Sequence, residues 1–555
     1  MDSINEISDR YVAEVVQHSP ITATALGRDV RQGEFDDFSP DGLAEHQRLV
    51  TESLAAARSA AVSTDSDKSA AATFIERTQL EAELFDAGQT HALLNVIASP
   101  VQDVRRVFDM MPKESDDDWA MIAERMSAVP DALRGYRHSL LEGARRGVVA
   151  SVRQVVKCAE QAETWSGATG TSPFFSGLAE SAGRDGALGA ALLAGSAQAG
   201  AAYAELAQFL RQEFAPLAPE KDAVGEQVYR LQSRFFTGAA LDLQESYDWA
   251  WQEFATIESE MKAVAGRLRP GMALAEVAES LDRDPRYLIA GQSQFRDWMQ
   301  SQSDEAVAAV RATAFDIPDE IVTLDCRIAP PGGGVGAYYT PPSDDLTRPG
   351  SMWWKVAADT VEFARWREVT TVYHEGVPGH HLQMATQVYA KDTLNDFQRL
   401  MSFISGHGEG WALYAERLMR ELGFMDDDGE LLGLLDSQLF RTARVIIDIG
   451  MHLELTIPAG SGFHEGEPWT PQLGLEFLLT RTLSEPRHAR DEIDRYLGWP
   501  GQAPSYKLGE RVWLAAREDA MSRHGAGFDL KAFHTKALNL GGMGLDPLVA
   551  QLATL

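Results

Sequence analysis

The chain has 555 residues, of which 45% are hydrophobic and 24% charged, a composition typical of a globular protein with a large core. Its 82 acidic and 50 basic residues give a formal net charge of -32. This charge repels phosphate backbones and anionic lipid headgroups, so we expect neither nucleic acid nor membrane as a partner. The first residues are acidic and show no basic segment followed by an apolar run, which predicts a cytoplasmic protein.

Residues 1–318 are predicted to form a succession of amphipathic helices rich in Ala, Leu, Glu, Gln and Arg. Turn-forming clusters at 214–222 and 268–277 separate some of them. The least polar stretch, 186–203, consists mainly of Gly and Ala and lacks the larger apolar residues that favour bilayer insertion. We therefore expect a closely packed helix there, and we expect the whole N-terminal region to form one wall of an active-site cleft.

The sequence pattern changes at residues 319–356, where β-branched and aromatic residues alternate between Pro and Gly, which predicts a small sheet. Within this region, the segment 332–342 contains Tyr338 and Tyr339. It is either an edge strand that pairs with an extended peptide and places these tyrosines in the cleft to bind substrate, or a Gly-rich turn with packed tyrosines. Helices follow, so the predicted fold class is mainly α, with residues 319–555 as the catalytic region, continuous with the rest.

The segment YHEGVPGHHLQ, residues 373–383, contains a His-Glu pair and two further histidines. On an unbroken helix, His374 would lie about 9 Å along the axis from His380 and about 10.5 Å from His381. Neither pair could then share one zinc ion, which requires each imidazole nitrogen at about 2.0–2.1 Å. Pro378 removes a backbone donor, and the glycine after it permits unusual conformations, so a break here could return the next histidine to the face that carries His374. We predict a metal site on the condition that the helix breaks at Pro378.

The predicted metal ligands are His374 and His380, with His381 as the alternative second ligand. The stretch GHGEGWALYAE, residues 406–416, supplies a third ligand, Glu409, on a following helix. The two cysteines of the chain are too few for a Cys-rich site. Because the ligands include imidazole nitrogen, we expect Zn²⁺ rather than magnesium or calcium.

Several other side chains could support chemistry at this site. Zinc acidifies a water toward neutrality, and Glu375, next to the first ligand, would act as the catalytic base that accepts its proton and passes it to the leaving group. Tyr506 is predicted to donate a hydrogen bond to the tetrahedral intermediate; alternatively, it anchors a loop to the next helix. His407 and Glu416 could orient the imidazoles, although solvated or salt-bridged roles are the default for both.

An apolar helix predicted near residues 431–456 carries four ionisable residues on one face: Arg441, Arg444, Asp448 and His452. We predict that His452 is catalytic, as an orienting group or a stabiliser of the oxyanion, and that Arg444 binds substrate. The alternative is a structural ion-pair stripe in which Arg444 and Asp448 satisfy each other.

Four motifs, VYHEGVPGHHLQ, GEGWALYAE, RTARVIIDIGMH and PGQAPSYKLG, together resemble the bacterial family known as domain of unknown function 885, which is placed among the zincin-like metallopeptidases. They fall within residues 336–510. The resemblance implies a mostly helical zinc hydrolase with a His, His, Glu site of the gluzincin type. His374 and His380 correspond to its paired histidines, Glu409 to its glutamate ligand, and Glu375 to its base.

The sequence therefore predicts a zinc-dependent hydrolase, foremost a metallopeptidase acting on a peptide or small amide substrate. One alternative is a zinc enzyme that acts on a non-peptide small molecule. Another is a catalytically silent binding protein of the same fold. The presence of Glu375 argues against the silent protein, because a binding scaffold has no need for a base beside the ligands.

Overall fold

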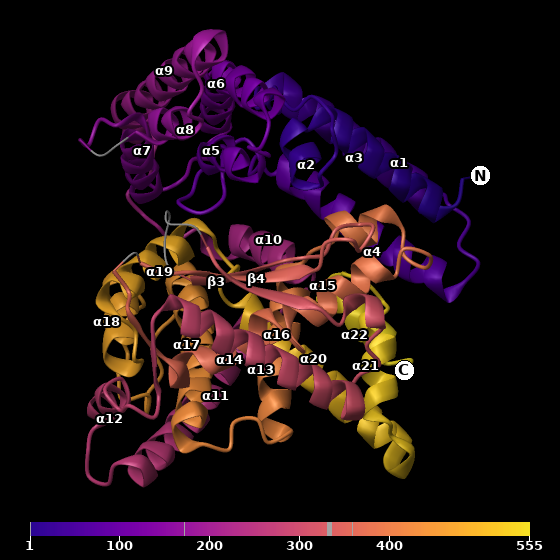
Figure 1. The fold of residues 1–555 in the computed structure, drawn as a ribbon, viewed down its shortest axis with the longest axis vertical. Helices are drawn as coiled ribbons and strands as arrows, with labels where there is room; N and C mark the ends of the chain where they lie inside the picture. Colours follow the sequence, from indigo (N-terminus) through magenta and orange to yellow (C-terminus); the bar gives the residue numbers. More distant parts are fainter. Residues whose placement is uncertain (1, 171–172, 330–335, 358) are drawn as a thin grey trace. The chain divides into compact units, whose positions relative to one another are not determined.

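The computed structural model describes residues 2–170, 173–329, 336–357 and 359–555 (Figure 1). Contacts within the chain define two compact units. Unit 1 comprises Met1–Val62, Phe74–Val224 and Asp491–Pro500, and unit 2 comprises Ser63–Thr73, Gly225–Arg490 and Gly501–Leu555. The main division thus falls after Val224, whereas the sequence pattern changes near residue 318. Residues 225–318 join unit 2 because their helices pack on later elements: Leu243–Leu268 (α11) packs on Asp428–Leu453 (α17), and Gln292–Thr313 (α13) packs on Leu324–Ile328 (β2) and Arg365–Glu375 (α14).

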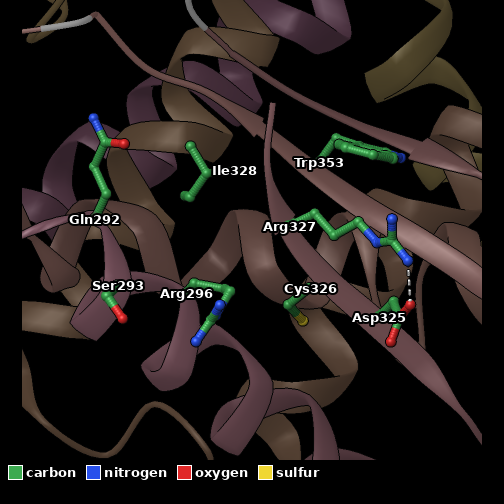
Figure 2. A pocket seen from close by; sticks show the side chains of 8 residues that line it. All are labelled: Gln292, Ser293, Arg296, Asp325, Cys326, Arg327, Ile328 and Trp353. Carbon is green, nitrogen blue, oxygen red and sulfur yellow. Dashed lines mark hydrogen bonds and ion pairs between the residues drawn. The ribbon is translucent and has the colours of Figure 1, made fainter. Parts of the chain in front are cut away.

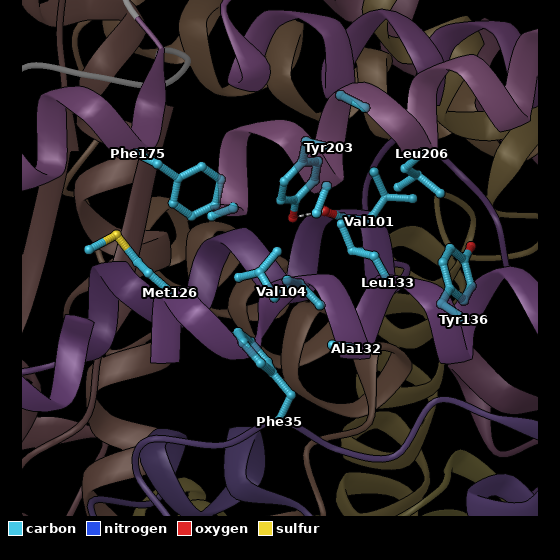
Figure 3. Packing of buried hydrophobic residues seen from close by; sticks show 14 of the residues in the cluster. Phe35, Val101, Val104, Met126, Ala132, Leu133, Tyr136, Phe175, Tyr203 and Leu206 are labelled. Carbon is cyan, nitrogen blue, oxygen red and sulfur yellow. Dashed lines mark hydrogen bonds between the residues drawn. The ribbon is translucent and has the colours of Figure 1, made fainter. Parts of the chain in front are cut away.

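Unit 1 is helical. Its elements are α1 (Ile4–His18), α2 (Pro20–Ala25), α3 (Pro40–Arg58), most of α4 (Asp65–Asp86), α5 (Pro100–Met110), α6 (Asp116–Arg145), α7 (Val152–Ser166), α8 (Phe174–Ser181), α9 (Gly186–Phe209), two short turns (Leu210–Phe214 and Ala215–Leu217) and the end of α19 (Pro486–Gly498). Apolar residues of α5, α6, α7, α8 and α9 form a core in which the ring centroids of Phe175 and Tyr203 lie 5.5 Å apart (Figure 3).

The Gly- and Ala-rich stretch at 186–203 forms the first part of α9, as predicted. Small residues let this helix approach α6 closely. A side chain at Gly195 would place its Cβ 2.9 Å from the Ala123 carbonyl oxygen and 3.0 Å from Met126 Cβ. In the part of the chain that the structure describes, no helix is both long enough and apolar enough to cross a bilayer.

Unit 2 contains the remaining elements. They are α10 (Gly225–Thr237), α11 (Leu243–Leu268), α12 (Leu274–Leu281), β1 (Leu288–Ala290), α13 (Gln292–Thr313), a 3-10 turn (Asp319–Ile321), β2 (Leu324–Ile328), β3 (Gly336–Thr340), β4 (Gly350–Lys355), β5 (Glu362–Ala364), α14 (Arg365–Glu375), α15 (His380–Tyr389), a π-helical turn (Phe397–Met401), α16 (Ser405–Glu421), α17 (Asp428–Leu453), α18 (Pro471–Arg481), α20 (Ser505–His524), a 3-10 turn (Gly525–Gly527), α21 (Leu530–Leu538) and α22 (Leu545–Leu552). The fold is mainly α, as predicted.

The predicted sheet region at 319–356 is confirmed. Its strands run in the order β2-β4-β3, with β2 parallel and β3 antiparallel to β4, so that Cys326 pairs with Met352 and Tyr338 with Trp353. Strand β3 lies at one edge of this sheet. An edge position is what the interpretation of segment 332–342 as a peptide-pairing strand requires. Residues 332–335 of that segment lie outside the described residues. A second, two-stranded sheet pairs β1 with β5.

Helix α16 is positioned by glycines. A Cβ on Gly410 would lie 2.4 Å from the carbonyl carbon of Gly509, and one on Gly509 would lie 1.9 Å from the Gly406 oxygen. Only residues without side chains permit this distance between α16 and α20. The close approach fixes the position of a helix that carries Glu409 and Glu416.

Candidate metal centre

The predicted helix break is present. Helix α14 ends at Glu375 and α15 begins at His380, and the Val377–Pro378 peptide bond between them is cis. Gly379 is required here, because a Cβ would lie 1.9 Å from the His374 carbonyl oxygen. The indole nitrogen of Trp411, on α16, donates hydrogen bonds to the carbonyl oxygens of Pro378 (2.9 Å) and Gly379 (3.3 Å). Helix α16 therefore holds the break in place.

The break brings together His374, His380 and Glu409, which we call the metal triad. Its ligand atoms lie within 4.8 Å of one another. Glu409 Oε2 is 3.3 Å from His374 Nε2 and 3.4 Å from His380 Nε2. Ligands bound tetrahedrally at 2.0–2.1 Å from one zinc ion are about 3.3–3.4 Å apart, whereas a direct hydrogen bond is typically about 2.9 Å. Both Glu409 distances therefore suit ligands that share one ion.

A hydrogen bond at Nδ1, the ring nitrogen that does not face Glu409, orients the His374 imidazole. Its Nδ1 donates to Glu416 Oε1 at 2.8 Å, and Thr370 Oγ1 donates to Glu416 Oε2 at 2.6 Å. Glu409 and Glu416 are seven residues apart, so they lie on one face of α16 and contact the two nitrogens of the same imidazole. A hydrogen-bonded carboxylate behind a ligand histidine fixes its tautomer and directs Nε2 toward the metal.

His381, the alternative second ligand, lies outside the triad. Its Nε2 donates to the Ile321 carbonyl oxygen and its Nδ1 accepts from the Tyr339 hydroxyl, both at 2.9 Å. Burial lowers the pKa of His381 to about 4, so the ring is neutral. Both of its nitrogens are engaged, whereas Nε2 of His380 faces Glu409.

The charge of the site also fits a cation. Glu375, Glu409 and Glu416 are three carboxylates near two imidazoles in a desolvated environment. Burial raises the pKa of Glu375. Burial also opposes ionisation of Glu409, yet His380 and His374 hold its pKa well below the ordinary value. Buried carboxylates require compensating positive charge, and two imidazole nitrogens with one carboxylate form a ligand set that zinc accepts with one position left open.

Asp448 and His452, on the polar face of α17, contact each other and two other segments of unit 2. Asp448 Oδ2 accepts hydrogen bonds from the Tyr229 hydroxyl (2.6 Å) and the Gly501 amide (2.8 Å). His452 Nε2 lies 4.0 Å from Asp448 Oδ1, and its ring centroid is 5.5 Å from that of Tyr229. His452 is fully buried and is not a member of the triad. These contacts do not test the catalytic role predicted for His452, which stays a prediction.

Arg444 and Tyr506 are brought together. The Arg444 guanidinium carbon lies 4.9 Å from the Tyr506 ring centroid and 4.8 Å from that of Phe440. Arg444 is buried, and Tyr506 is half-buried near the start of α20. Arg441, on the same face, affects the site electrostatically: its charge partly opposes the rise that burial causes in the pKa of Glu375, and together with His374 it lowers the pKa of Glu416.

The two predicted substrate-binding tyrosines have different environments. Tyr338 is 38% exposed on β3, is stacked 6.2 Å from Trp353, and has the Lys355 ammonium 5.0 Å from its ring centroid. Tyr339 points the other way and donates to His381, one residue from the triad. Gly350 allows this contact, because a Cβ there would lie 2.1 Å from the Tyr339 hydroxyl oxygen.

His407 is a packing residue. Its ring stacks on Trp513 at 5.4 Å, its Nδ1 accepts from the Met543 amide at 3.3 Å, and burial lowers its pKa to about 4. Sequence reasoning missed Trp411 and Thr370. The position of Thr370, four residues before His374 on one helix, was a usable signal, because such residues share a face. The contact of Trp411 with Pro378 had no signal in the sequence.

A surface pocket of about 640 Å³ lies on α13, β2 and β4 (Figure 2). Among the described residues that line it are Arg296, Arg327 and Trp353, and no triad residue is included. Arg327 pairs with Asp325 at 2.7 Å, and Arg296 pairs with Asp297 at 2.5 Å. Because neighbouring carboxylates neutralise both cations, this pocket carries no strong charge for a ligand.

Comparison with known proteins defines the class. The family described as "Bacterial protein of unknown function (DUF885)" matches residues 20–552. The chain therefore belongs to this family, as its motifs predicted. A comparison with curated proteins finds no match.

Two solved structures have the same fold. One is described as "the putative lipoprotein from Colwellia psychrerythraea"; it is 21% identical in sequence, has a TM-score of 0.84, and the match covers 100% of this chain and 99% of that one. The other is described as "a putative lipoprotein of unknown function from Shewanella oneidensis", with 18% identity, a TM-score of 0.76 and 100% of both chains covered. At this identity the similarity shows the fold alone.

The contact between Glu416 and His374 leads to a first prediction. Glu416→Gln should weaken zinc binding by about 10–100-fold, because the amide no longer provides the charge that fixes the imidazole. Zinc affinity is measured by competition with a chromophoric chelator. Glu421→Gln, an exposed change on the same helix, is the matched control and should leave the affinity unchanged. Equal affinities in the two variants would contradict the orienting role of Glu416.

Proposed function

We propose that the protein is a zinc-dependent hydrolase, and specifically a zincin-like metallopeptidase that cleaves peptide or small amide bonds. One observation carries this proposal: Nε2 of His374 and of His380 lie 3.3 and 3.4 Å from one Glu409 oxygen, the spacing of ligands that share an ion. The neighbouring Glu375 adds a buried carboxylate that can act as a base.

The chemistry follows from these residues. His374, His380 and Glu409 would hold the ion, which when bound supplies Lewis-acid activation of a water and of the scissile carbonyl. Glu375 accepts the proton of the attacking water and delivers it to the leaving nitrogen. Burial raises the pKa of Glu375 toward the range in which a carboxylate can both take up and release a proton.

The zinc content of protein purified without a His-tag tests this proposal. Elemental mass spectrometry should find about one zinc ion per chain in the wild type, and His374→Ala and His380→Ala should each abolish it. His381→Ala should retain zinc, because both nitrogens of His381 contact other groups. His464→Ala, which changes a half-buried loop histidine outside the triad, is the matched control and should retain zinc.

Two results would overturn the assignment. The first is wild-type protein that holds no zinc after zinc is supplied. The second is loss of zinc in His381→Ala together with retention in His380→Ala. If zinc is present, a peptide library and a set of non-peptide amides distinguish a peptidase from an enzyme for other small molecules.

The cytoplasmic location stays a prediction, because the similar solved proteins are described as putative lipoproteins. Cell fractionation tests it.

A further inference from the structure

An aromatic side chain lies exposed beside the metal triad. Phe403, in the connection that precedes α16, is 55% exposed. Its ring centroid lies 6.4 Å from that of His380, in an edge-on arrangement. Single exposed hydrophobic residues are common on protein surfaces. Phe403 differs from such residues because it contacts a member of the triad.

The backbone around Phe403 is fixed. The flanking residues Ser402 and Ile404 are 2% and 3% exposed. Ser402 Oγ donates to the Gly542 carbonyl oxygen at 2.7 Å, and the Ile404 carbonyl oxygen accepts from the amides of His407 and Gly408 at 3.0 and 2.9 Å. The exposure of Phe403 is therefore not the consequence of a loose loop.

The ring also lies against the backbone of α16. A Cβ on Gly408 would be 2.5 Å from Phe403 Cε2, so the glycine that precedes Glu409 provides the space for the ring. Phe403 thus contacts His380 of the triad and also Gly408, the residue that precedes Glu409. The buried metal triad is therefore bordered on one side by the apolar ring of Phe403, which is accessible to solvent.

Leaving this ring exposed forgoes the stabilisation that its burial would give. Binding sites typically combine a few placed polar groups with apolar and aromatic walls, and a bound ligand recovers the burial of those walls. We infer that Phe403 forms the apolar wall of a substrate subsite, and that the substrate carries an aromatic or bulky aliphatic group next to the bond that is cleaved. This inference rests on the proposed function.

Two hydroxamates test it without requiring turnover, because both chelate zinc and only one is bulky. Acetohydroxamate reports the metal alone, and 3-phenylpropanohydroxamate adds an aromatic group. By calorimetry on zinc-loaded protein, the wild type should bind the phenyl compound about tenfold more tightly. Phe403→Ala should reduce this preference to about twofold or less, with the acetohydroxamate affinity unchanged.

Two further variants complete the experiment. Phe403→Leu keeps an apolar wall and should retain most of the preference. Met521→Ala removes another exposed hydrophobic side chain, 47% exposed on α20, and should keep the full preference. Zinc content, measured in parallel, should be the same in all variants, because Phe403 is not a ligand.

The outcomes separate the two hypotheses. Equal binding of both hydroxamates to the wild type, or a full preference in Phe403→Ala, overturns the subsite while the metal centre stands. If the wild type takes up no zinc, the proposed metal centre is wrong, and the inference falls with it. If zinc is bound but neither hydroxamate binds, the ion has no accessible position beside Phe403, and the subsite is overturned while the metal centre stands.

Discussion

Glu375→Gln should lower kcat by about 10²–10⁴-fold while zinc content and the thermal unfolding temperature stay at wild-type values. The amide has nearly the shape of the carboxylate but cannot accept a proton from water. Glu375 is 8% exposed, and burial raises its pKa, so it is a buried base next to a triad member rather than a solvated surface group. The measurement is the steady-state rate on a substrate selected from the peptide and amide libraries.

The matched control is Glu368→Gln on the same helix. Glu368 lies seven residues before Glu375 and hence on the same face of α14, two turns from the triad. We expect its rate to stay within about twofold of the wild type. If Glu375→Gln retains wild-type activity, the protein does not use this carboxylate as a base, and the proposed mechanism fails even if zinc is bound.

Gly379→Ala should destabilise the protein by about 3 kcal/mol or more and remove its zinc. The added Cβ would lie 1.9 Å from the His374 oxygen and 2.5 Å from the Tyr373 oxygen, and both are backbone atoms that no side-chain rotation can move away. Relieving the overlap would displace the start of α15, and with it His380. Denaturant unfolding gives the free energy, and elemental mass spectrometry gives the zinc content.

Gly266→Ala is the control for this substitution. Gly266 is an exposed position in α11, and a Cβ there would meet no atom within 4 Å. Alanine should stabilise the helix by about 0.4–1 kcal/mol, because it restricts the unfolded chain. The same Gly→Ala change is thus expected to lower the free energy of unfolding at position 379 and to raise it at position 266. Wild-type stability and zinc content in Gly379→Ala would show that the break can accommodate a side chain.

The local part of the site could be predicted from the sequence. Pro378 and Gly379 indicated the break because their backbone preferences act within a few residues. The spacing of the motif residues then placed His374, His380 and Glu409 as candidates, and the structure brings these three together.

The non-local part could not be predicted. The motifs make His381 an alternative ligand and His407 a candidate for orienting the imidazoles. Both are instead desolvated residues whose partners, Ile321, Tyr339 and Met543, are distant in the sequence. The division after Val224 likewise depends on the packing of α11 and α13 against later elements. Periodicity identifies a buried face, but it does not identify the partner that buries it.

The two indole hydrogen bonds from Trp411 to the Pro378 and Gly379 carbonyls have a consequence for when the proposed metal centre could bind an ion. Helix α16 carries Glu409 and also holds the segment that carries His374 and His380, and its own position depends on glycine contacts with α20. A partly synthesised chain that already contains His374, His380 and Glu409 still lacks α20. Metal loading is therefore expected to follow synthesis and folding of the C-terminal helices, so that only a finished unit 2 competes for zinc in the cell.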